Sequence, residues 1–392
     1  MGARAGLIFW GGFCRAKVAF TICFMSAAHP SPGDFLLATC QGGAEAALVG
    51  RQQTVLPGLA KAAWRRGVVT FRLPAGSEPP SAADLDRLVF ARTVVHSCGQ
   101  AVGADTAALV AALQARVGSH AWDDIHVWRR EPRVEGDPEA VREAIVAALE
   151  PARQEAIVAA GGASQMGALV LDCVLDAPDR WWVGWHVADS PQACLPGGIY
   201  PGVLPAGKVS RAWLKLDEAI ASFGITFESG ARAVELGAAP GGACQRLLEA
   251  GLIVTGIDPA LVDQEVAAHP RFEQWRMRAR DVKLRQLRGF DWVVADMNID
   301  PTSTLDAIER VLSAPGKPPR GIIATLKLPN WSRAGELPGW LERFVAWGYA
   351  PRARQLSTGG REVCVVAERT TASRRPSSIN RRPSRATPRP GR

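Results

Sequence analysis

Four charged residues lie next to apolar segments in the second half of the chain. Lys215 stands between two leucines in "SRAWLKLDEAI", and Lys327 does so in "IIATLKLPN", where Pro329 ends the apolar run. Asp296 follows "FDWVVA", and Glu362 precedes "VCVVA". A charge in apolar surroundings costs free energy unless a partner offsets it. A lysine held there can act as a proton acceptor if burial or a second cation lowers its pKa.

Each of these residues, taken singly, also has a structural explanation. A lysine can reach solvent along its aliphatic stem, and an acid after a strand can belong to a turn. A glutamate at the start of a strand can lie at the edge of a sheet. The chemical interpretation requires a ligand site nearby, and the sequence between Lys215 and Asp296 contains a candidate.

The candidate is a glycine-rich loop, "GAAPGG" at 237–242, which follows the buried strand "AVEL". A helix, "ACQRLLEAG", and a second strand, "LIVTGID", come next, and Asp258 ends that strand 21 residues after Gly237. In Rossmann-type units an acid at this place hydrogen-bonds ribose hydroxyls. Pro240 removes one of the N–H donors that a pyrophosphate would use. The loop therefore favours S-adenosylmethionine, which has a ribose and an adenine but no phosphate, over a nicotinamide cofactor or a purely structural turn.

The elements that must position these residues alternate between strand and helix from about 210 to 370. This alternation predicts an α/β domain of the Rossmann-like class with a mostly parallel, seven-stranded sheet. Ligands bind at the carboxyl edge of such sheets. Asp296 and Lys327 end successive strands of the pattern, so we expect both at that edge. "RMRARD" predicts Asp281 at the end of a third strand, where it can accept a hydrogen bond from an adenine amino group.

The first 200 residues follow a different pattern, in which short β-like pieces alternate with Ala-rich helices, as in an α+β region. A Pro- and Gly-rich segment at 191–207 is typical of a linker. The expected divisions are an extension outside the fold (1–29, with a targeting segment as the alternative), an α+β domain (30–110), a second α+β domain (111–200), the Rossmann-like domain (205–370) and a disordered Arg-rich tail (371–392).

Composition narrows the class of protein further. The 392 residues are 47% hydrophobic and 21% charged, as in a soluble globular protein of two or three domains. No apolar run is long enough for a membrane-spanning helix, so no membrane association is expected. The eight cysteines form no CxxC pair, which argues against a zinc site and a disulfide scaffold. The sequence therefore predicts a cytoplasmic protein without a metal ion.

The formal net charge of +8 comes from the two ends of the chain. The last 22 residues hold seven arginines and no acid, and the first 24 hold three basic residues and no acid. The remainder is close to neutral. Binding to nucleic acid would therefore depend on a local basic patch, with or without help from the tail.

In this order, the four charged residues resemble the Lys–Asp–Lys–Glu tetrad of the FtsJ-type ribose 2′-O-methyltransferases. The segments "ELGAAPGG", "ADM", "TLKLP" and "REVCVVA" are similar to signatures of that family. The phrase "SRAWLKLDEA" and the long N-terminal region most resemble the RlmM branch. Members of that branch are bacterial enzymes that methylate a cytidine ribose in large-subunit ribosomal RNA. The resemblance covers about residues 210–369.

The resemblance implies S-adenosylmethionine-dependent 2′-O-methylation of a cytidine ribose in 23S ribosomal RNA. It also implies that the region before 205 binds RNA and contains a THUMP-like domain at 111–200. The implied catalytic residues are Lys327 as proton acceptor, with Lys215, Asp296 and Glu362 orienting and tuning it. In the alternative, Lys327 only steers the hydroxyl, and the proton leaves late to solvent. The implied cofactor-binding residues are Glu235, Gly237, Ala239, Pro240, Gly241, Gly242, Asp258, Asp281 and Asp296.

Two residues depart from the family pattern, and three other functions compete. Glu235 stands where the family usually has Asp, and Ala243 where Trp commonly walls the cofactor pocket. The first competing function is a non-catalytic RNA-binding or ribosome-assembly protein on the same fold. The others are a 2′-O-methyltransferase acting on a different RNA and a small-molecule O-methyltransferase. The intact tetrad favours an enzyme, and the long N-terminal region favours an RNA substrate.

Overall fold

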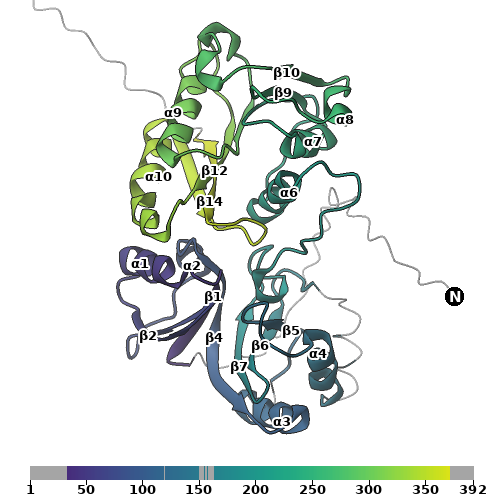
Figure 1. Cartoon of the computed structure of the whole chain (residues 1–392). Coiled ribbons are helices and arrows are strands. Elements are labelled where there is room, and N and C mark those ends of the chain that lie inside the picture. Colours follow the sequence, from purple (N-terminus) through teal and green to yellow (C-terminus); the bar gives the residue numbers. More distant parts are fainter. Residues whose placement is uncertain (1–32, 119, 150–153, 155–156, 158–162, 371–392) are drawn as a thin grey trace, which may run out of the picture.

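The computed structural model describes residues 33–118, 120–149, 154, 157 and 163–370. These residues form two α/β bodies that lie against one another (Figure 1). The predicted extension at 1–29 and the predicted Arg-rich tail at 371–392 lie outside the described residues. In the described part of the chain, no helix combines the length and apolar character needed to cross a membrane.

The N-terminal body is built on a seven-stranded sheet with the order β2-β3-β1-β4-β7-β6-β5. Its strands pair antiparallel, apart from the parallel pair β5 and β6. The strands are β1 (Phe35–Cys40), β2 (Ala60–Arg65), β3 (Val68–Arg72), β4 (Ala91–Val102), β5 (Asp124–Arg129), β6 (Leu169–Ala177) and β7 (Arg180–Val187).

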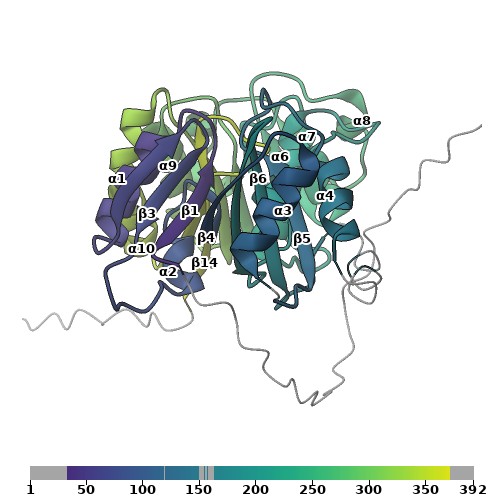
Figure 2. The same ribbon diagram turned by 90° about the horizontal axis from the view of Figure 1, so that it is seen from below.

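This one sheet crosses the boundary expected at residue 110. The first half of β4 pairs with β1 and its second half pairs with β7, because the strand is 12 residues long. The regions 30–110 and 111–200 therefore share a sheet. The helices of this body are α1 (Glu45–Val55), α2 (Ala82–Asp86), α3 (Thr106–Val117) and α4 (Pro138–Ala147). Figure 2 shows α3 and α4 on the same side of β5 and β6.

The C-terminal body has the predicted Rossmann-like sheet, with seven strands in the order β10-β9-β8-β11-β12-β14-β13. Strand β14 pairs antiparallel with β12 and with β13, and the other four pairs are parallel, so the sheet is mostly parallel. The strands are β8 (Arg232–Leu236), β9 (Ile253–Ile257), β10 (Phe272–Trp275), β11 (Trp292–Ala295), β12 (Gly321–Lys327), β13 (Tyr349–Arg354) and β14 (Glu362–Arg369).

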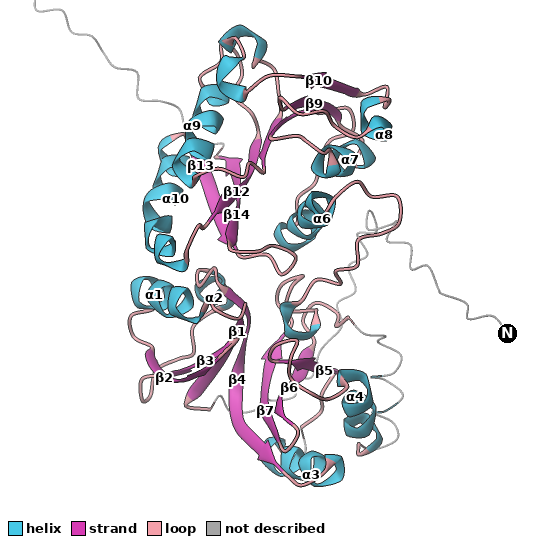
Figure 3. Cartoon of the chain, viewed as in Figure 1, coloured by secondary structure: helices cyan, strands magenta, loops and turns pink. Residues whose placement is uncertain are grey.

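Amphipathic helices cover both faces of this sheet (Figure 3). Side chains of α6 and α7 pack with one set of strand residues, and side chains of α9 and α10 pack with the alternate set. Alternation along the strands produces these two apolar faces. The helices are α6 (Arg211–Phe223), α7 (Gly242–Glu249), α8 (Gln264–Ala267), α9 (Pro301–Leu312) and α10 (Leu337–Ala346), with short 3-10 turns η1 (Pro196–Gly198), η2 (Ala279–Asp281), η3 (Leu284–Gln286) and η4 (Trp331–Glu336).

The segment predicted as a linker does join the two bodies, but it is packed rather than free. Gln192 is buried and accepts a hydrogen bond from Arg354 of β13. The backbone N–H of Tyr200 donates to Ser357 Oγ at 2.9 Å. Gly197 lies so close to the Trp128 ring that a Cβ would be 2.7 Å from it. Glycine at this position thus allows the segment to pack closely on strand β5 of the N-terminal sheet.

The two bodies share one apolar core. Leu36 and Phe71 of the N-terminal sheet belong to the same buried cluster as Leu326 and Phe344 of the C-terminal body. Helix α1 contacts η4, and Gln355 donates to Gln41 across the boundary at 2.6 Å. A shared core favours a fixed orientation of one body against the other.

Candidate active site

The structure brings the four charged residues of the tetrad together at one edge of the C-terminal sheet. Asp296 directly follows β11, Lys327 is the last residue of β12, and Glu362 is the first residue of β14. Lys327 and Glu362 face each other because they are register partners in the antiparallel pair β12–β14. Lys215 reaches the same edge from α6, the helix that precedes the first strand of this sheet.

The four side chains form a ring of alternating charge. Lys327 Nζ lies 2.8 Å from Asp296 Oδ1 and 2.6 Å from Glu362 Oε2. Lys215 forms an ion pair with Asp296, and its Nζ lies 3.4 Å from Glu362 Oε1. Each ammonium group therefore contacts both carboxylates. The side chains remain 10–21% exposed, so a substrate group can reach the ring from solvent.

The electrostatics of the ring contradict the expectation of a lysine pKa lowered toward neutrality. Burial acts to lower the pKa of Lys327, but the charges and hydrogen bonds of Asp296 and Glu362 outweigh it and raise that pKa above its ordinary value. Burial acts to raise the pKa of Asp296, but Lys215 and Lys327 hold it below its ordinary value. Lys327 is thus an ammonium group at neutral pH, because two carboxylates oppose the single neighbouring cation.

A buried glutamate that the sequence analysis did not identify supports the ring. Glu218 of α6 is 1% exposed and accepts four hydrogen bonds, from the backbone N–H and the hydroxyl groups of Ser357 and Thr358. These bonds fix the turn that leads into Glu362. The signal in the sequence is its spacing, since Glu218 follows Lys215 by three residues and so shares its helix face. Gly359 lets the chain pass close to Glu362, because a Cβ there would be 2.8 Å from the carboxylate.

The glycine loop forms the turn between β8 and α7 beside this ring. Gly237 has a φ of +84°, and a Cβ there would be 2.8 Å from Met297 Cγ. Gly242 begins α7, and a Cβ there would be 2.9 Å from the backbone nitrogen of Trp213. Glycine at this second position therefore allows α7 to approach the start of α6. Ala239, Pro240 and Gly241 complete the loop.

Two of the predicted cofactor-binding acids lie next to this loop. Asp258 follows β9 and accepts hydrogen bonds from the backbone N–H groups of Ala239, at 3.2 Å, and Ala260, at 2.8 Å. Glu235 is fully buried near the end of β8, and burial raises its pKa to about 8. Within the described residues, Glu235 Oε2 has no hydrogen-bond partner. A buried oxygen without a hydrogen-bond partner is suited to accept a hydrogen bond from a ligand.

The prediction that Asp281 ends a third strand is wrong. Strand β10 ends at Trp275, and Asp281 lies six residues further on, in the 3-10 turn η2. Its side chain is 59% exposed. The alternating Met277 and Ala279 imitate a strand in the sequence, but the chain turns after Trp275, where the N–H of Met277 donates to the carbonyl of Trp275 at 2.8 Å. Ala243, which stands where the family commonly has Trp, belongs to α7 and is buried in the core.

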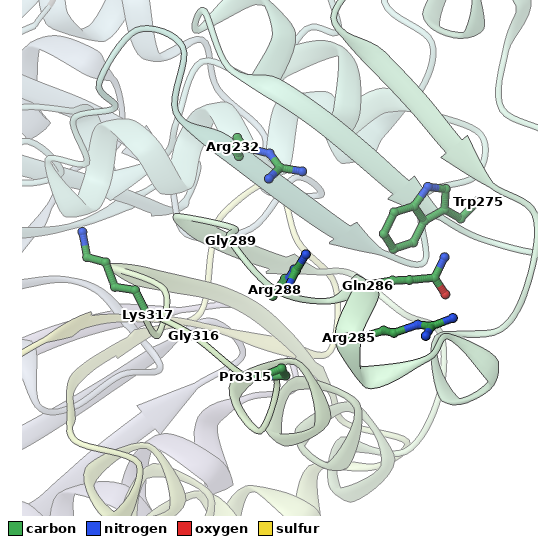
Figure 4. A pocket seen from close by; sticks show the side chains of 9 residues that line it. All are labelled: Arg232, Trp275, Arg285, Gln286, Arg288, Gly289, Pro315, Gly316 and Lys317. Atoms are coloured by element: carbon green, nitrogen blue, oxygen red, sulfur yellow. The ribbon is translucent and has the colours of Figure 1, made fainter.

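A separate hollow of about 600 Å³ lies away from the ring (Figure 4). It is built mainly from segments that precede β8, β11 and β12, whereas the ring lies where strands β11 and β12 end. Its lining combines one aromatic ring with several cationic side chains, namely Trp275, Arg232, Arg285, Arg288 and Lys317. The hollow is thus a basic patch of the local kind expected from the charge distribution.

Sheet order, glycine loop and charged ring together define a Rossmann-like methyltransferase domain. Residues 208–326 match the family model described as FtsJ-like methyltransferase. The chain is also similar to proteins named ribosomal RNA large subunit methyltransferase M. It is 32% identical to the one from Halorhodospira halophila over 194 residues, 47% of this chain and 55% of that protein.

Two further relatives with the same name show similar agreement. Identity is 36% with the protein of Marinobacter nauticus, over 41% of this chain and 44% of that protein. Identity is 29% with the protein of Laribacter hongkongensis, over 58% of this chain and 66% of that protein. The chain thus spans about half the length of the curated relatives it matches. Among solved structures, TrmN from Thermus thermophilus covers 86% of this chain, with 17% identity and a TM-score of 0.32.

Proposed function

We propose that this protein transfers a methyl group from S-adenosylmethionine to the 2′-hydroxyl of a ribose, a cytidine ribose, in large-subunit ribosomal RNA. The observation that carries the proposal is the ring of Lys215, Asp296, Lys327 and Glu362 beside the glycine loop. Each residue follows the order of the FtsJ-type tetrad. The names of the relatives support ribosomal RNA as the substrate.

The residues around the loop fit the proposed cofactor. Glu235 Oε2, a buried acceptor without a partner in the described part of the chain, would receive the ammonium group of the methionine end. Gly237 lets the loop pass close to Met297 at the carboxyl edge of β8, and Asp258 stands where ribose hydroxyls are bound in such folds. Asp281 would contact the adenine only from the η2 turn. The bound cofactor would supply a methyl group that its sulfonium already activates.

The ring would hold the 2′-hydroxyl in line with this methyl group, which is the larger part of the catalysis required. Because the pKa of Lys327 is raised, the ammonium form orients the hydroxyl, and Asp296 and Glu362 hold the ammonium in place. The hydroxyl proton then leaves late, to solvent, as the oxygen–carbon bond forms. The raised pKa thus favours a role in which Lys327 orients the 2′-hydroxyl over one in which it accepts the proton.

Two surfaces support RNA as the substrate. The N-terminal body packs on η4, which begins four residues after Lys327, and the rings of Phe90 and Trp331 meet there at 6.3 Å. RNA held by that body would therefore be delivered close to the ring. The basic hollow around Trp275 offers cations for phosphates and a ring for base stacking at the other edge of the sheet.

The first experiment measures methyl transfer from labelled S-adenosylmethionine to unmodified large-subunit ribosomal RNA. We expect the label in an alkali-resistant dinucleotide that contains 2′-O-methylcytidine. Lys327→Met should lower the rate at least about 100-fold, the usual scale for one catalytic group, and retain cofactor binding by calorimetry. With steering by the ammonium, kcat of the wild type should stay flat between pH 7 and 9.

Three results would contradict this proposal. A rate that rises about tenfold per pH unit between pH 7 and 9 would show that Lys327 is the base. Tight binding of cofactor and RNA without transfer would identify a non-catalytic RNA-binding protein. Methyl transfer to another RNA, with none to large-subunit RNA, would support the proposed reaction but contradict the proposed substrate.

A further inference from the structure

A cluster of buried polar side chains lies within the N-terminal sheet, far from the residues of the charged ring in the sequence. His126 of β5, Asp172 of β6 and His186 of β7 are 1%, 0% and 6% exposed. His126 and Asp172 are register partners in neighbouring strands. Their sheet face is opposite the one that packs under α3 and α4, because the intervening residues Ile125 and Leu171 belong to that helix-covered core.

Hydrogen bonds at the outer nitrogens determine where both imidazole protons sit. His186 Nε2 lies 2.9 Å from the carbonyl oxygen of Ala193, which only accepts, so Nε2 carries a proton. His126 Nε2 lies 2.8 Å from Ser164 Oγ, and that hydroxyl lies 2.8 Å from Asp124 Oδ2. The Ser164 hydroxyl donates to the acid, so its oxygen accepts from His126 Nε2.

In the neutral form, which a metal-bound histidine adopts, the inner nitrogens of both rings would present lone pairs to the same carboxylate. His186 Nδ1 lies 2.5 Å from Asp172 Oδ2, and His126 Nδ1 lies 4.0 Å from Asp172 Oδ1. His126 Nδ1 and Asp172 Oδ1 have no hydrogen-bond partner among the described residues. Three acceptor groups thus converge, with one ligand atom of each within 4.8 Å of the others. Acceptors facing one another in the interior repel unless a proton, as in a His186–Asp172 hydrogen bond, or a metal cation lies between them.

We propose that His126, Asp172 and His186 bind a divalent transition-metal ion, with Zn²⁺ as the best match. Two imidazole nitrogens and one carboxylate suit zinc, whereas Mg²⁺ and Ca²⁺ prefer oxygen ligands alone. The outer hydrogen bonds to Ala193 and to Ser164–Asp124 are the kind that orient metal-bound histidines. The missing CxxC pairs argued against a zinc site, but this trio has no local spacing by which a sequence pattern could reveal it.

A cavity that borders one of the three ligands, His186, offers a route to the site. His186, Asp189 and Ala193 line a cavity of about 500 Å³ that also touches Arg352 and Arg354 of the C-terminal body. An ion can enter from this cavity, and a water molecule from it can complete a four-coordinate shell.

The ion would stabilise the connection between the two bodies. His186 is hydrogen-bonded to the carbonyl oxygen of Ala193. Gln192, which precedes Ala193, accepts a hydrogen bond from Arg354, and Arg354 also donates to Asp86. Fixing the His186 ring therefore fixes the start of the segment that joins the bodies. The assigned role is structural, and it makes no use of the proposed methyl transfer.

The test uses the full chain, stripped with a chelator and titrated with Zn²⁺ by calorimetry, with Co²⁺ as a spectroscopic probe. We expect one equivalent of Zn²⁺ to bind, tetrahedral Co²⁺ absorption bands, and a Tm that rises with added Zn²⁺. Asp172→Asn and His126→Gln should each weaken Zn²⁺ binding at least about tenfold, the scale seen when one member of a metal shell is lost. His269→Gln, in the other body, is the matched control and should bind as the wild type does.

The alternative is a metal-free ion pair between a protonated His186 and Asp172. Stoichiometric Zn²⁺ binding that persists in both variants, or a stripped wild type whose Tm does not respond to Zn²⁺, would overturn the metal site. If Asp172→Asn does not fold, the conservative His126→Gln and the titration of stripped wild type still decide between the two. Because the readouts are metal content, absorption and Tm, failure here leaves the methyltransferase proposal unaffected.

Discussion

At the scale of single residues, the structure changes the charge state inferred for Lys327 of the tetrad. Lys327 in an apolar strand suggested a lysine prepared to lose its proton. In the structure two carboxylates reach its ammonium group, so the charged form is the stable one. Coulombic attraction over less than 3 Å outweighs the cost of partial burial. A lysine in such a ring orients a substrate as a cation.

Glu235 yields a prediction about pH and stability. Its pKa is about 8 in the folded protein, raised mainly by burial, against an ordinary value of 4.5. A raised folded-state pKa contributes stability that is fully present below about pH 4.5 and is lost as pH rises through about 8. Glu235→Gln should remove this loss and so make the cofactor-free protein more stable than wild type at pH 8, by on the order of 2–4 kcal/mol.

The measurement is urea unfolding of both proteins at several values between pH 5 and pH 8. The difference between the two should grow with pH across this range. A constant difference would show that Glu235 has an ordinary pKa. Glu342→Gln, an exposed change on α10, is the control and should leave the pH dependence of wild type intact.

At the scale of elements, α6 connects the charged ring to the turn before β14. Lys215 belongs to the ring, and Glu218, one turn later, accepts hydrogen bonds from Ser357 and Thr358. Strand β14 begins four residues beyond this turn, so its first residue, Glu362, depends on where the turn is held. Sequence periodicity predicts such a helix, but not which loop its buried acid will meet.

Glu218→Gln should therefore act as a positioning mutation. Loss of the carboxylate weakens four hydrogen bonds to a buried charged group, and we expect the protein to lose about 2 kcal/mol of stability. kcat should fall roughly tenfold, while the Kd for cofactor stays unchanged, since Glu218 forms its hydrogen bonds with Ser357 and Thr358 rather than with the loop at 237–242. Steady-state kinetics well below the Tm separate this result from simple unfolding. An unchanged kcat in the folded variant would contradict a positioning role.

At the scale of the whole molecule, two bodies with one apolar core present RNA-binding candidates at separate places. The N-terminal body adjoins η4 near the ring, and the basic hollow lies at the opposite edge of the C-terminal sheet. A large folded RNA could contact both. The body of the chain is close to neutral, so such contacts would depend on these local groups.

We expect the paired change Arg285→Glu and Arg288→Glu to weaken binding of large-subunit RNA about tenfold or more at moderate salt. Each lost phosphate contact should also lower the slope of log affinity against log salt by nearly one. Cofactor binding should not change, because the hollow and the glycine loop are separate. Lys61→Glu, on the exposed edge strand β2, is the control. Unchanged RNA affinity and salt slope would exclude the hollow from the RNA interface.

The sequence by itself determined the Rossmann-like domain, the ends of β11 and β12, and the members of the ring. It could do so because hydrophobic periodicity and glycine spacing are local properties, and because strand ends place Asp296 and Lys327 on one edge. Only the tertiary structure decided the charge state of Lys327, the early end of β10 before Asp281, and the single sheet that joins 30–110 to 111–200. It alone brought His126, Asp172 and His186 together. These features depend on contacts between residues far apart in the chain, and periodicity within a segment carries no information about them.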